Sequence, residues 1–97
     1  MLVRIVKLTF KVENISSFEQ IFEETNPFIR NFEGCEFLEA YQEKDNPKVF
    51  FTYSHWKDET ALNNYRNSDF FKSVWSKTKV LFDAKPEAWS VRKVVGC

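Results

Sequence analysis

The segment of residues 48–56, with the sequence KVFFTYSHW, constrains the fold of this chain most, because it holds the densest group of aromatic residues and the single histidine. A half-buried strand alternates apolar and polar residues, whereas Val49, Phe50, Phe51 and Tyr53 put large side chains on both faces. This strand is therefore expected to be covered on both sides. The chain's own helices would cover one face, and since 97 residues supply little for a further layer, a partner subunit would cover the other.

Length and composition indicate one domain, residues 1–97, near the size at which a single core suffices and the free energy of unfolding is about 5–10 kcal/mol. Aromatic residues make up 18% of the chain and eleven residues are Phe, so rings build most of the core. Lys plus Arg equals Asp plus Glu at 14 each, without a basic run, which argues against a nucleic-acid partner. No apolar run approaches about 18 residues and the start lacks a signal-peptide pattern, so a cytoplasmic protein without a membrane partner is expected.

The two cysteines do not predict a metal site, because Cys35 and Cys97 are too few and too far apart. Cys97, at the terminus, is a poor disulfide partner. For Cys35 the general burial of free cysteines favours a small, buried hydrophobic residue. The cysteines therefore give no reason to expect a metal site.

The chain begins with a predicted strand and then a helix start. Residues 2–10 alternate in two sets that are both largely apolar, as in a strand covered on both faces. Either Asn14 or Ser16 is placed to cap the helix that follows, and Ser16 stands three residues before Glu19, the spacing of a capping box.

The first helix and the second strand are predicted from periodicity and from their stop signals. Apolar residues recur at three- and four-residue intervals over residues 15–32, which is typical of a helix lying on a sheet. Pro27 predicts a kink or break in this helix, and Gly34 predicts its end. Residues 35–42 read as a strand, and the polar residues 43–47 predict a hairpin to the aromatic strand.

The second half of the chain predicts two short helices and a last strand. Asp58 is placed to cap a helix, and residues 67–69 restart a second one, whose apolar stripe extends over residues 71–82. Pro86 ends this section, and residues 88–95 read as a strand.

The predicted order of strand, helix, strand, strand, helix, strand gives an α+β fold of the ferredoxin-like βαββαβ type, with one antiparallel sheet and the helices on one face. The opposite face would carry Val3, Ile5, Phe51 and Tyr53. Exposed apolar patches larger than about a few hundred Å² mark an interface. Two such sheet faces would bury each other, so a homodimer is expected.

Residues 51–65 (FTYSHWKDETALNNY), residues 68–72 (SDFFK) and the Gly34-Cys35 pair together resemble the antibiotic biosynthesis monooxygenase domain, over nearly the whole chain. The resemblance implies a dimeric α+β barrel with a cavity in each subunit between sheet and helices. It also implies oxidation of quinols and polycyclic phenols by O₂ without metal or flavin, with haem degradation in one branch.

Candidate site residues follow from strand parity together with this resemblance, since the tryptophan of the family motif belongs to the cavity side. The residues expected to line the cavity and bind a small aromatic substrate come from two strands and two helices: Arg4, Val6, Thr52, Ser54, Trp56, Tyr65, Phe71 and Trp75. Tyr65 and Trp56 are the candidates for a catalytic role, the first as a hydrogen-bond donor to a substrate oxygen and the second as a stacking ring.

The chain departs from the family pattern at several positions. The haem-degrading branch would have an Asn near Val6, a Trp near Tyr65 and a His near Trp75, so haem degradation is not expected. The polyketide-oxidising branch would have an Asn at Thr52, and many other members carry a His at Tyr65, the natural base near pH 7.

Each ring also has a structural interpretation. Trp56 and Tyr65 could be framework residues of the core, with the Tyr65 hydroxyl satisfied locally, and Trp75 could be either core or pocket. His55 lies on the face opposite Trp56, which favours an exposed or interface position over the role of base.

Arg4 is a cation in an otherwise apolar strand and needs a partner if it is buried. It could pair with Glu36 or Glu39 across the sheet, or it could hold an anionic substrate.

Three functions remain open from sequence. The first is a cofactor-independent monooxygenase that oxidises a quinol or polycyclic phenol with O₂. The second is a non-oxidative isomerase or decarboxylase of a small aromatic compound, and the third is a binding protein without turnover.

Overall fold

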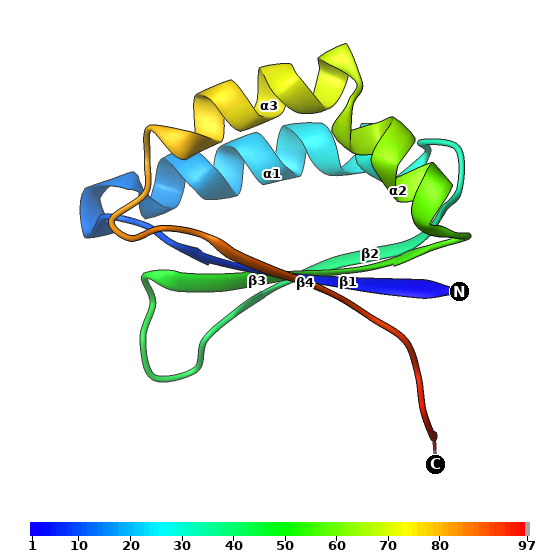
Figure 1. The fold of residues 1–97 in the computed structure, drawn as a ribbon. Helices are drawn as coiled ribbons and strands as arrows, with labels where there is room; N and C mark the ends of the chain where they lie inside the picture. The colour runs from blue at the N-terminus through cyan, green and yellow to red at the C-terminus, as the bar shows by residue number, and fades with distance from the viewer. Residues whose placement is uncertain (97) are drawn as a thin grey trace.

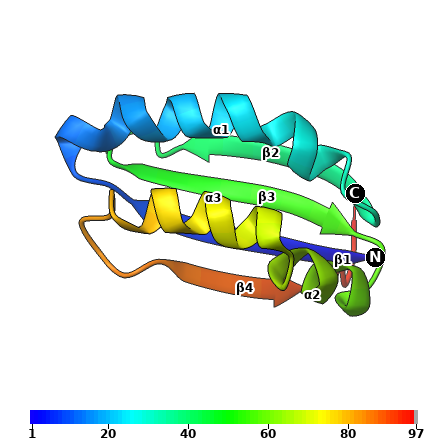
Figure 2. The same cartoon turned by 90° about the horizontal axis from the view of Figure 1, so that it is seen from above.

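The computed structural model describes residues 1–96, so the expectation for Cys97 lies outside the described residues. The elements in chain order are β1 (Leu2–Thr9), a 3₁₀ turn (Val12–Asn14), α1 (Ile15–Arg30), β2 (Cys35–Gln42), β3 (Val49–Trp56), α2 (Glu59–Arg66), α3 (Asp69–Lys79) and β4 (Glu87–Val91). The strands form one antiparallel sheet in the order β2-β3-β1-β4. All three helices lie on one face of this sheet (Figures 1 and 2), which confirms the ferredoxin-like α+β fold. The second helical section consists of two helices, α2 and α3.

The register of the two central strands sets which side chains face the helices. Val6 pairs with Thr52 on the helix-covered face, and Ile5 pairs with Tyr53 on the open face. Because side chains alternate along a strand, the residues of β1 and β3 that face the helices are the ones predicted from parity. The open face therefore carries an apolar stripe that no element of residues 1–96 covers (Figure 1).

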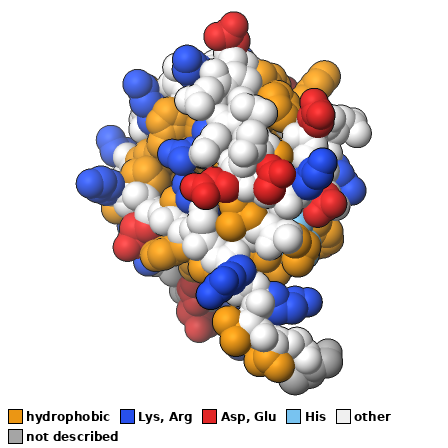
Figure 3. All heavy atoms as spheres, turned by 45° about the vertical axis from the view of Figure 1, so that its right-hand side comes forward, with side chains coloured by type: hydrophobic (Ala, Val, Ile, Leu, Met, Phe, Trp, Pro, Cys, Tyr) orange, Lys and Arg blue, Asp and Glu red, His pale blue; other side chains and the backbone are white. Residues whose placement is uncertain are grey.

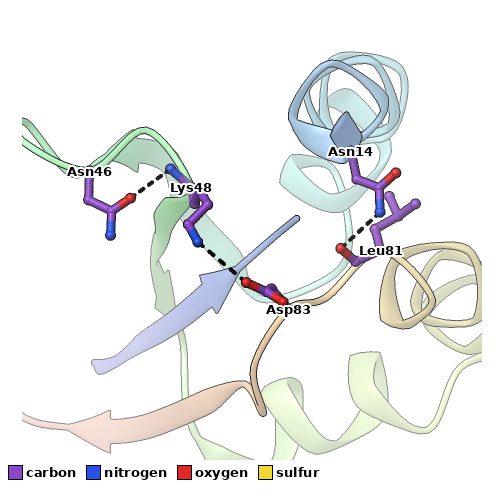
Figure 4. A network of polar contacts seen from close by, with 5 residues as sticks. All are labelled: Asn14, Asn46, Lys48, Leu81 and Asp83. Atoms are coloured by element: carbon purple, nitrogen blue, oxygen red, sulfur yellow. Dashed lines mark hydrogen bonds and ion pairs between the residues drawn. The ribbon is translucent and has the colours of Figure 1, made fainter. Parts of the chain in front are cut away.

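The start of α1 differs from the prediction. The helix begins at Ile15, directly after the 3₁₀ turn, and Ser16 lies inside it, so the expected capping box with Glu19 is absent. Asn14 occupies the N-cap position with a backbone that is not extended (φ −104°, ψ 1°) and makes no side-chain cap, and its Nδ2 donates a hydrogen bond to the Leu81 carbonyl at 3.3 Å (Figure 4). A tertiary contact has taken the side chain that the local pattern assigned to a cap.

A kink or a break was predicted at Pro27, and the break is absent, since α1 runs continuously from Ile15 to Arg30. A proline removes the hydrogen bond to the carbonyl four residues earlier, here that of Glu23. Asn26 replaces it, because its Nδ2 donates to the Glu23 carbonyl at 3.3 Å. This local substitute is consistent with an uninterrupted helix.

The predicted cap at Asp58 is confirmed, and the predicted restart at residues 67–69 is capped by Ser68. Asp58 Oδ1 accepts a hydrogen bond from the backbone N–H of Ala61 at 2.8 Å, and Ser68 Oγ accepts one from that of Phe71 at 3.1 Å. Each cap satisfies a backbone donor that a helix start leaves free. These two caps fix where α2 and α3 begin and therefore how their side chains point toward the sheet.

The last strand is shorter than predicted, ending at Val91 instead of residue 95. Its only partner is β1, and Val91 already pairs with Val3, next to the start of β1. No strand remains to pair with the residues beyond it. Val94 and Val95 are 90% and 82% exposed, and the C-terminal segment projects from the domain with hydrophobic and basic side chains on its surface (Figure 3).

The end of the domain at the β2–β3 hairpin is held by polar contacts. Lys48 Nζ lies 3.4 Å from Asp83 Oδ2, and its backbone N–H donates to Asn46 Oδ1 at 3.2 Å (Figure 4). These contacts connect the hairpin loop to the segment between α3 and β4. Among residues 1–96, no helix has the length and apolar character needed to cross a bilayer.

The hydrophobic core is divided into two clusters rather than one. The first centres on the buried residues Leu8, Phe10, Phe18 and Phe50, and the second on Cys35, Trp56 and Leu62. Cys35 is buried, as expected from sequence. Since residues of both clusters line one cavity, the space between sheet and helices is only partly filled.

Candidate functional site

A cavity of about 620 Å³ lies between the sheet and the three helices. Ligand pockets typically measure about 300–1,000 Å³, so this volume suits a small molecule. The structure brings all eight sequence-predicted site residues to the wall of this one cavity: Arg4, Val6, Thr52, Ser54, Trp56, Tyr65, Phe71 and Trp75. Their placement is thereby known, and their roles stay predictions.

The floor of the cavity comes from the alternating residues of β1 and β3. Val6 and Thr52 face each other in the register, as do Arg4 and Ser54. Ser54 is buried, and its Oγ accepts a hydrogen bond from Nε1 of Trp56 at 3.0 Å. The Ser54 hydroxyl is therefore engaged in positioning the Trp56 ring.

A row of aromatic rings forms the wall above this floor. Tyr65 stacks on Trp56 with ring centroids 5.0 Å apart, and Phe71 meets the Tyr65 ring edge-on at 5.1 Å. Trp75 continues the row, stacked on Phe71 at 6.0 Å. The flat, apolar surfaces of these rings suit a flat aromatic ligand.

Trp56 is only 1% exposed, because Tyr65 stacks on its ring and the buried residues Cys35 and Leu62 belong to the same hydrophobic cluster. A ring with so little free surface cannot present a face to a substrate. The framework interpretation of Trp56 therefore holds over the stacking one, and the rings of Phe71 and Trp75, both half-buried, are better placed for contact.

Tyr65 carries a hydroxyl group without a hydrogen-bond partner within residues 1–96. Burial, and to a smaller extent the nearby Cys35, raise the pKa of Tyr65 to about 12. The hydroxyl is therefore protonated at neutral pH and can donate a hydrogen bond, but it cannot serve as a base.

We expect this pKa to appear in the stability of the domain at alkaline pH. Tyr65 ionises near its ordinary value of 10.0 in the unfolded chain and near 12 in the folded one, so its contribution is complete below pH 10 and is lost as pH rises to 12. The loss amounts to about 2–3 kcal/mol. Urea unfolding between pH 9 and 12 should show a shallower decline for Tyr65→Phe than for the wild-type chain. Parallel declines would contradict the burial of the hydroxyl.

The predicted ion pair of Arg4 with Glu36 or Glu39 was wrong. In the sheet order, β3 lies between β1 and β2, so the acidic residues of β2 are two strands away from Arg4. Glu39 also pairs with Tyr53 and so lies on the open face. Arg4 Nη1 instead donates a hydrogen bond to Ser90 Oγ on β4 at 2.9 Å.

Sequence reasoning missed the polar residues at the mouth of the cavity. These residues lie on the last turns of α2 and the first turn of α3, and each is exposed at the surface: Asn63, Arg66, Asn67 and Lys72. Lys72 is exposed and also lines the cavity. Arg66 could have been found, since it stands four residues after Leu62, whose side chain faces the sheet.

His55 does not line the cavity. It lies on the open face of the sheet, with its ring 5.0 Å from Phe37 and 5.1 Å from Tyr53. Its Nε2 is buried and has no hydrogen-bond partner within the described chain. This position agrees with an interface histidine and not with a base for a reaction in the cavity.

In the part of the chain that the structure describes, no three His, Cys, Asp or Glu side chains gather closely enough to hold a metal ion. Burial raises the pKa of the Cys35 thiol, which keeps it in its unreactive protonated form. The polar groups that line the cavity are hydroxyl groups, amides and cations.

Similarity to known proteins agrees with this geometry. The structure superposes on a crystal structure of a conserved protein from Methanosarcina mazei with a TM-score of 0.89 and 29% identity, covering 96% of this chain and 93% of that one. A crystal structure of an antibiotic biosynthesis monooxygenase gives a TM-score of 0.91 at 18% identity, with 98% and 100% covered. A protein from Mycobacterium tuberculosis gives 0.89 at 13% identity, with 98% and 96% covered.

No curated protein matches the chain significantly. The family model described as "Antibiotic biosynthesis monooxygenase" matches residues 1–75, which include β1, α1, β2, β3, α2 and most of α3. The matched part contains all eight residues of the predicted site. The chain belongs to the antibiotic biosynthesis monooxygenase family.

Proposed function

We propose that this protein is a monooxygenase that uses O₂ to oxidise a quinol or polycyclic phenol in the cavity between sheet and helices, without an added cofactor. The observation that carries the proposal is the cavity itself, an aromatic-walled space with one protonated hydroxyl at Tyr65, in a chain of this family. Oxidation of an electron-rich ring suits such a site, because the substrate supplies all the electrons.

The reaction balances without another reductant. For an anthrone-like substrate, a ring CH₂ group and O₂ give a ring C=O group and water, so one oxygen atom enters the product and the other leaves as water. The substrate provides the four electrons that reduce O₂. What the protein must supply is positioning, a hydrogen bond to the substrate oxygen and exclusion of water from the intermediate.

The described side chains fit these tasks. Phe71 and Trp75 hold the plane of the ring system, and Val6 closes the apolar floor. Tyr65 donates a hydrogen bond to a substrate oxygen, and Thr52 offers a second hydroxyl from the opposite wall. The lining residues include no carboxylate and no histidine that could accept a proton, so the proton of the substrate must pass to the solvent.

Isotope labelling tests the reaction type. Purified protein is incubated with an anthrone under ¹⁸O₂, under nitrogen, and without protein as a control. We expect one ¹⁸O atom in the product under ¹⁸O₂, at a rate above autoxidation, and no product under nitrogen. Turnover under nitrogen would replace the proposal with the isomerase or decarboxylase alternative, and binding without turnover would replace it with a binding protein.

We also propose that the open sheet face joins a second copy of the chain. The supporting observations are the apolar stripe with Ile5, Tyr53 and Trp89 and the buried His55 Nε2 without a partner. A second sheet would bury the stripe and bring polar groups within reach of the imidazole.

Light scattering after size exclusion tests this pairing. We expect twice the chain mass of 11.6 kDa for the wild type and for Phe28→Glu, a substitution on the helical side. Trp89→Glu, at a residue that is 44% exposed, should give the monomer mass. A monomeric wild type at micromolar concentration would contradict the pairing.

A further inference from the structure

We propose that the cavity is built for an aromatic anion, with the flat ring inside and the negative group held at the mouth between Arg4 of β1 and Arg66 of α2. This inference deepens the proposed function, and it rests on the same cavity being the substrate site. In Figure 2, α2 lies near the end of the sheet at which β1 begins; Arg4 is the third residue of β1, and Arg66 is the last residue of α2.

The charges that line the cavity are all of one sign. Arg4, Arg66 and Lys72 are among the lining residues, and none of the lining residues is Asp or Glu. The chain as a whole is neutral, with 14 acidic and 14 basic residues. The positive charge of the cavity therefore comes from the absence of Asp and Glu among its lining residues, and not from an excess of basic residues in the chain.

Arg4 in particular lacks a countercharge. Its guanidinium group carries five N–H donors, of which one is used in the bond to Ser90. The two ion pairs within residues 1–96 lie elsewhere, joining Lys7 to Glu87 and Lys48 to Asp83. Burial, and then the charge of Arg66, lower the pKa of Arg4, so its surroundings in the protein disfavour its charged form. A bound anion would remove that penalty.

The helix dipole explains the position of only one of the two arginines. Arg66 lies in the last turn of α2, where a cation stabilises the helix dipole. Arg4 lies in a strand, where no such effect applies, and its side chain faces the cavity beside apolar Val6. A ligand that satisfies both groups must combine an apolar ring with an acidic substituent.

The two cations also bear on the chemistry. Ionised phenols reduce O₂ more readily than neutral ones, and no lining side chain can take the phenol proton. A positive potential at the mouth lowers the pKa of a nearby phenol and so favours the reactive form without a base. Arg4 and Arg66 would in this way both select the substrate and help to ionise it.

A matched ligand pair tests the inference apart from any oxidation. Binding of 1-hydroxy-2-naphthoate and of its neutral isostere 1-hydroxy-2-naphthamide is measured by calorimetry under nitrogen. We expect the acid to bind the wild type at least about tenfold more tightly than the amide, as for hydrogen bonds to charged groups. Added NaCl should reduce this preference, because the mouth is open to solvent.

The variants locate the anion site. Arg4→Gln and Arg66→Gln should each lower the preference for the acid severalfold, with little change in binding of the amide. Because Arg66 is exposed, Arg66→Gln should leave folding unchanged. Lys79→Gln, an exposed charge change on α3 outside the cavity, should keep the preference. Equal binding of acid and amide, a preference that survives both Arg variants, or no binding of either ligand would overturn the inference. Absence of ¹⁸O incorporation alongside a clear acid preference would instead overturn the proposed function alone.

Discussion

Gly34→Ala is expected to destabilise the domain by about 2–5 kcal/mol, a large part of the total stability of a chain of this length. Gly34 has φ of 87°, in the left-handed region that L side chains rarely adopt. A Cβ atom at this position would lie 2.4 Å from the Cβ atom of Ala61 on α2. The Gly34 carbonyl also accepts a hydrogen bond from the backbone of Lys57 at 2.8 Å, so this loop cannot move away freely.

A double-mutant cycle separates the two causes. Urea unfolding is compared for the wild type, Gly34→Ala, Ala61→Gly and the double variant. Because Ala61→Gly removes the atom that the new Cβ would meet, the two substitutions should couple favourably by about 1–3 kcal/mol, while the cost of the positive φ remains. Additive effects would contradict the close approach of the α1–β2 loop to α2.

Phe10→Ala is expected to cost about 3–5 kcal/mol, the typical range for a buried Phe. Phe10 is 0% exposed and is stacked on Phe18 at 4.3 Å, with the rings of Phe82 and Phe50 at 5.2 and 5.9 Å. Removal of its ring leaves a space surrounded by other rings that cannot collapse together, since each is fixed by a different element. The free energy of unfolding, measured with urea, reports the loss.

Phe28→Ala is the matched control for this substitution. Phe28 lies on the same helix as Phe18 but is 65% exposed, with one ring contact, to Phe70 at 6.0 Å. We expect it to change the free energy of unfolding by no more than about 1 kcal/mol. Similar losses for the two variants would show that the first hydrophobic cluster does not centre on Phe10.

Local signals predicted much of the fold because they act within a few residues. The cap at Asp58, the helix restart at residues 67–69 and the alternation of β1 and β3 all appear in the structure. Signals failed where a distant or compensating contact intervened. Asn14 binds Leu81 instead of capping α1, and Asn26 supplies the hydrogen bond that Pro27 removes.

The strand residues of the candidate site could be predicted from the alternation of side chains along β1 and β3. Thr52 and Val6 face the helices because alternate residues of a strand must do so. The partner of Arg4 was not predictable in this way, since it depends on strand order, and β4 rather than β2 lies beside β1. The volume of the cavity could not be predicted from the residue pattern either. Hydrophobic periodicity shows which side chains face inward but not how completely they fill the space.

The rate of oxygen consumption in a cavity-blocked variant tests the central claim most directly. Ala88 lines the mouth of the cavity and is exposed, so Ala88→Phe places a ring there without burying it in a filled core, and Ala84→Phe, exposed and outside the cavity, is the control. With anthrones and hydroquinones as substrates, we predict uptake above autoxidation for the wild type and Ala84→Phe, and a loss of at least about tenfold for Ala88→Phe. Uptake no faster than autoxidation, or equal rates in all three proteins, would contradict oxidation inside this cavity.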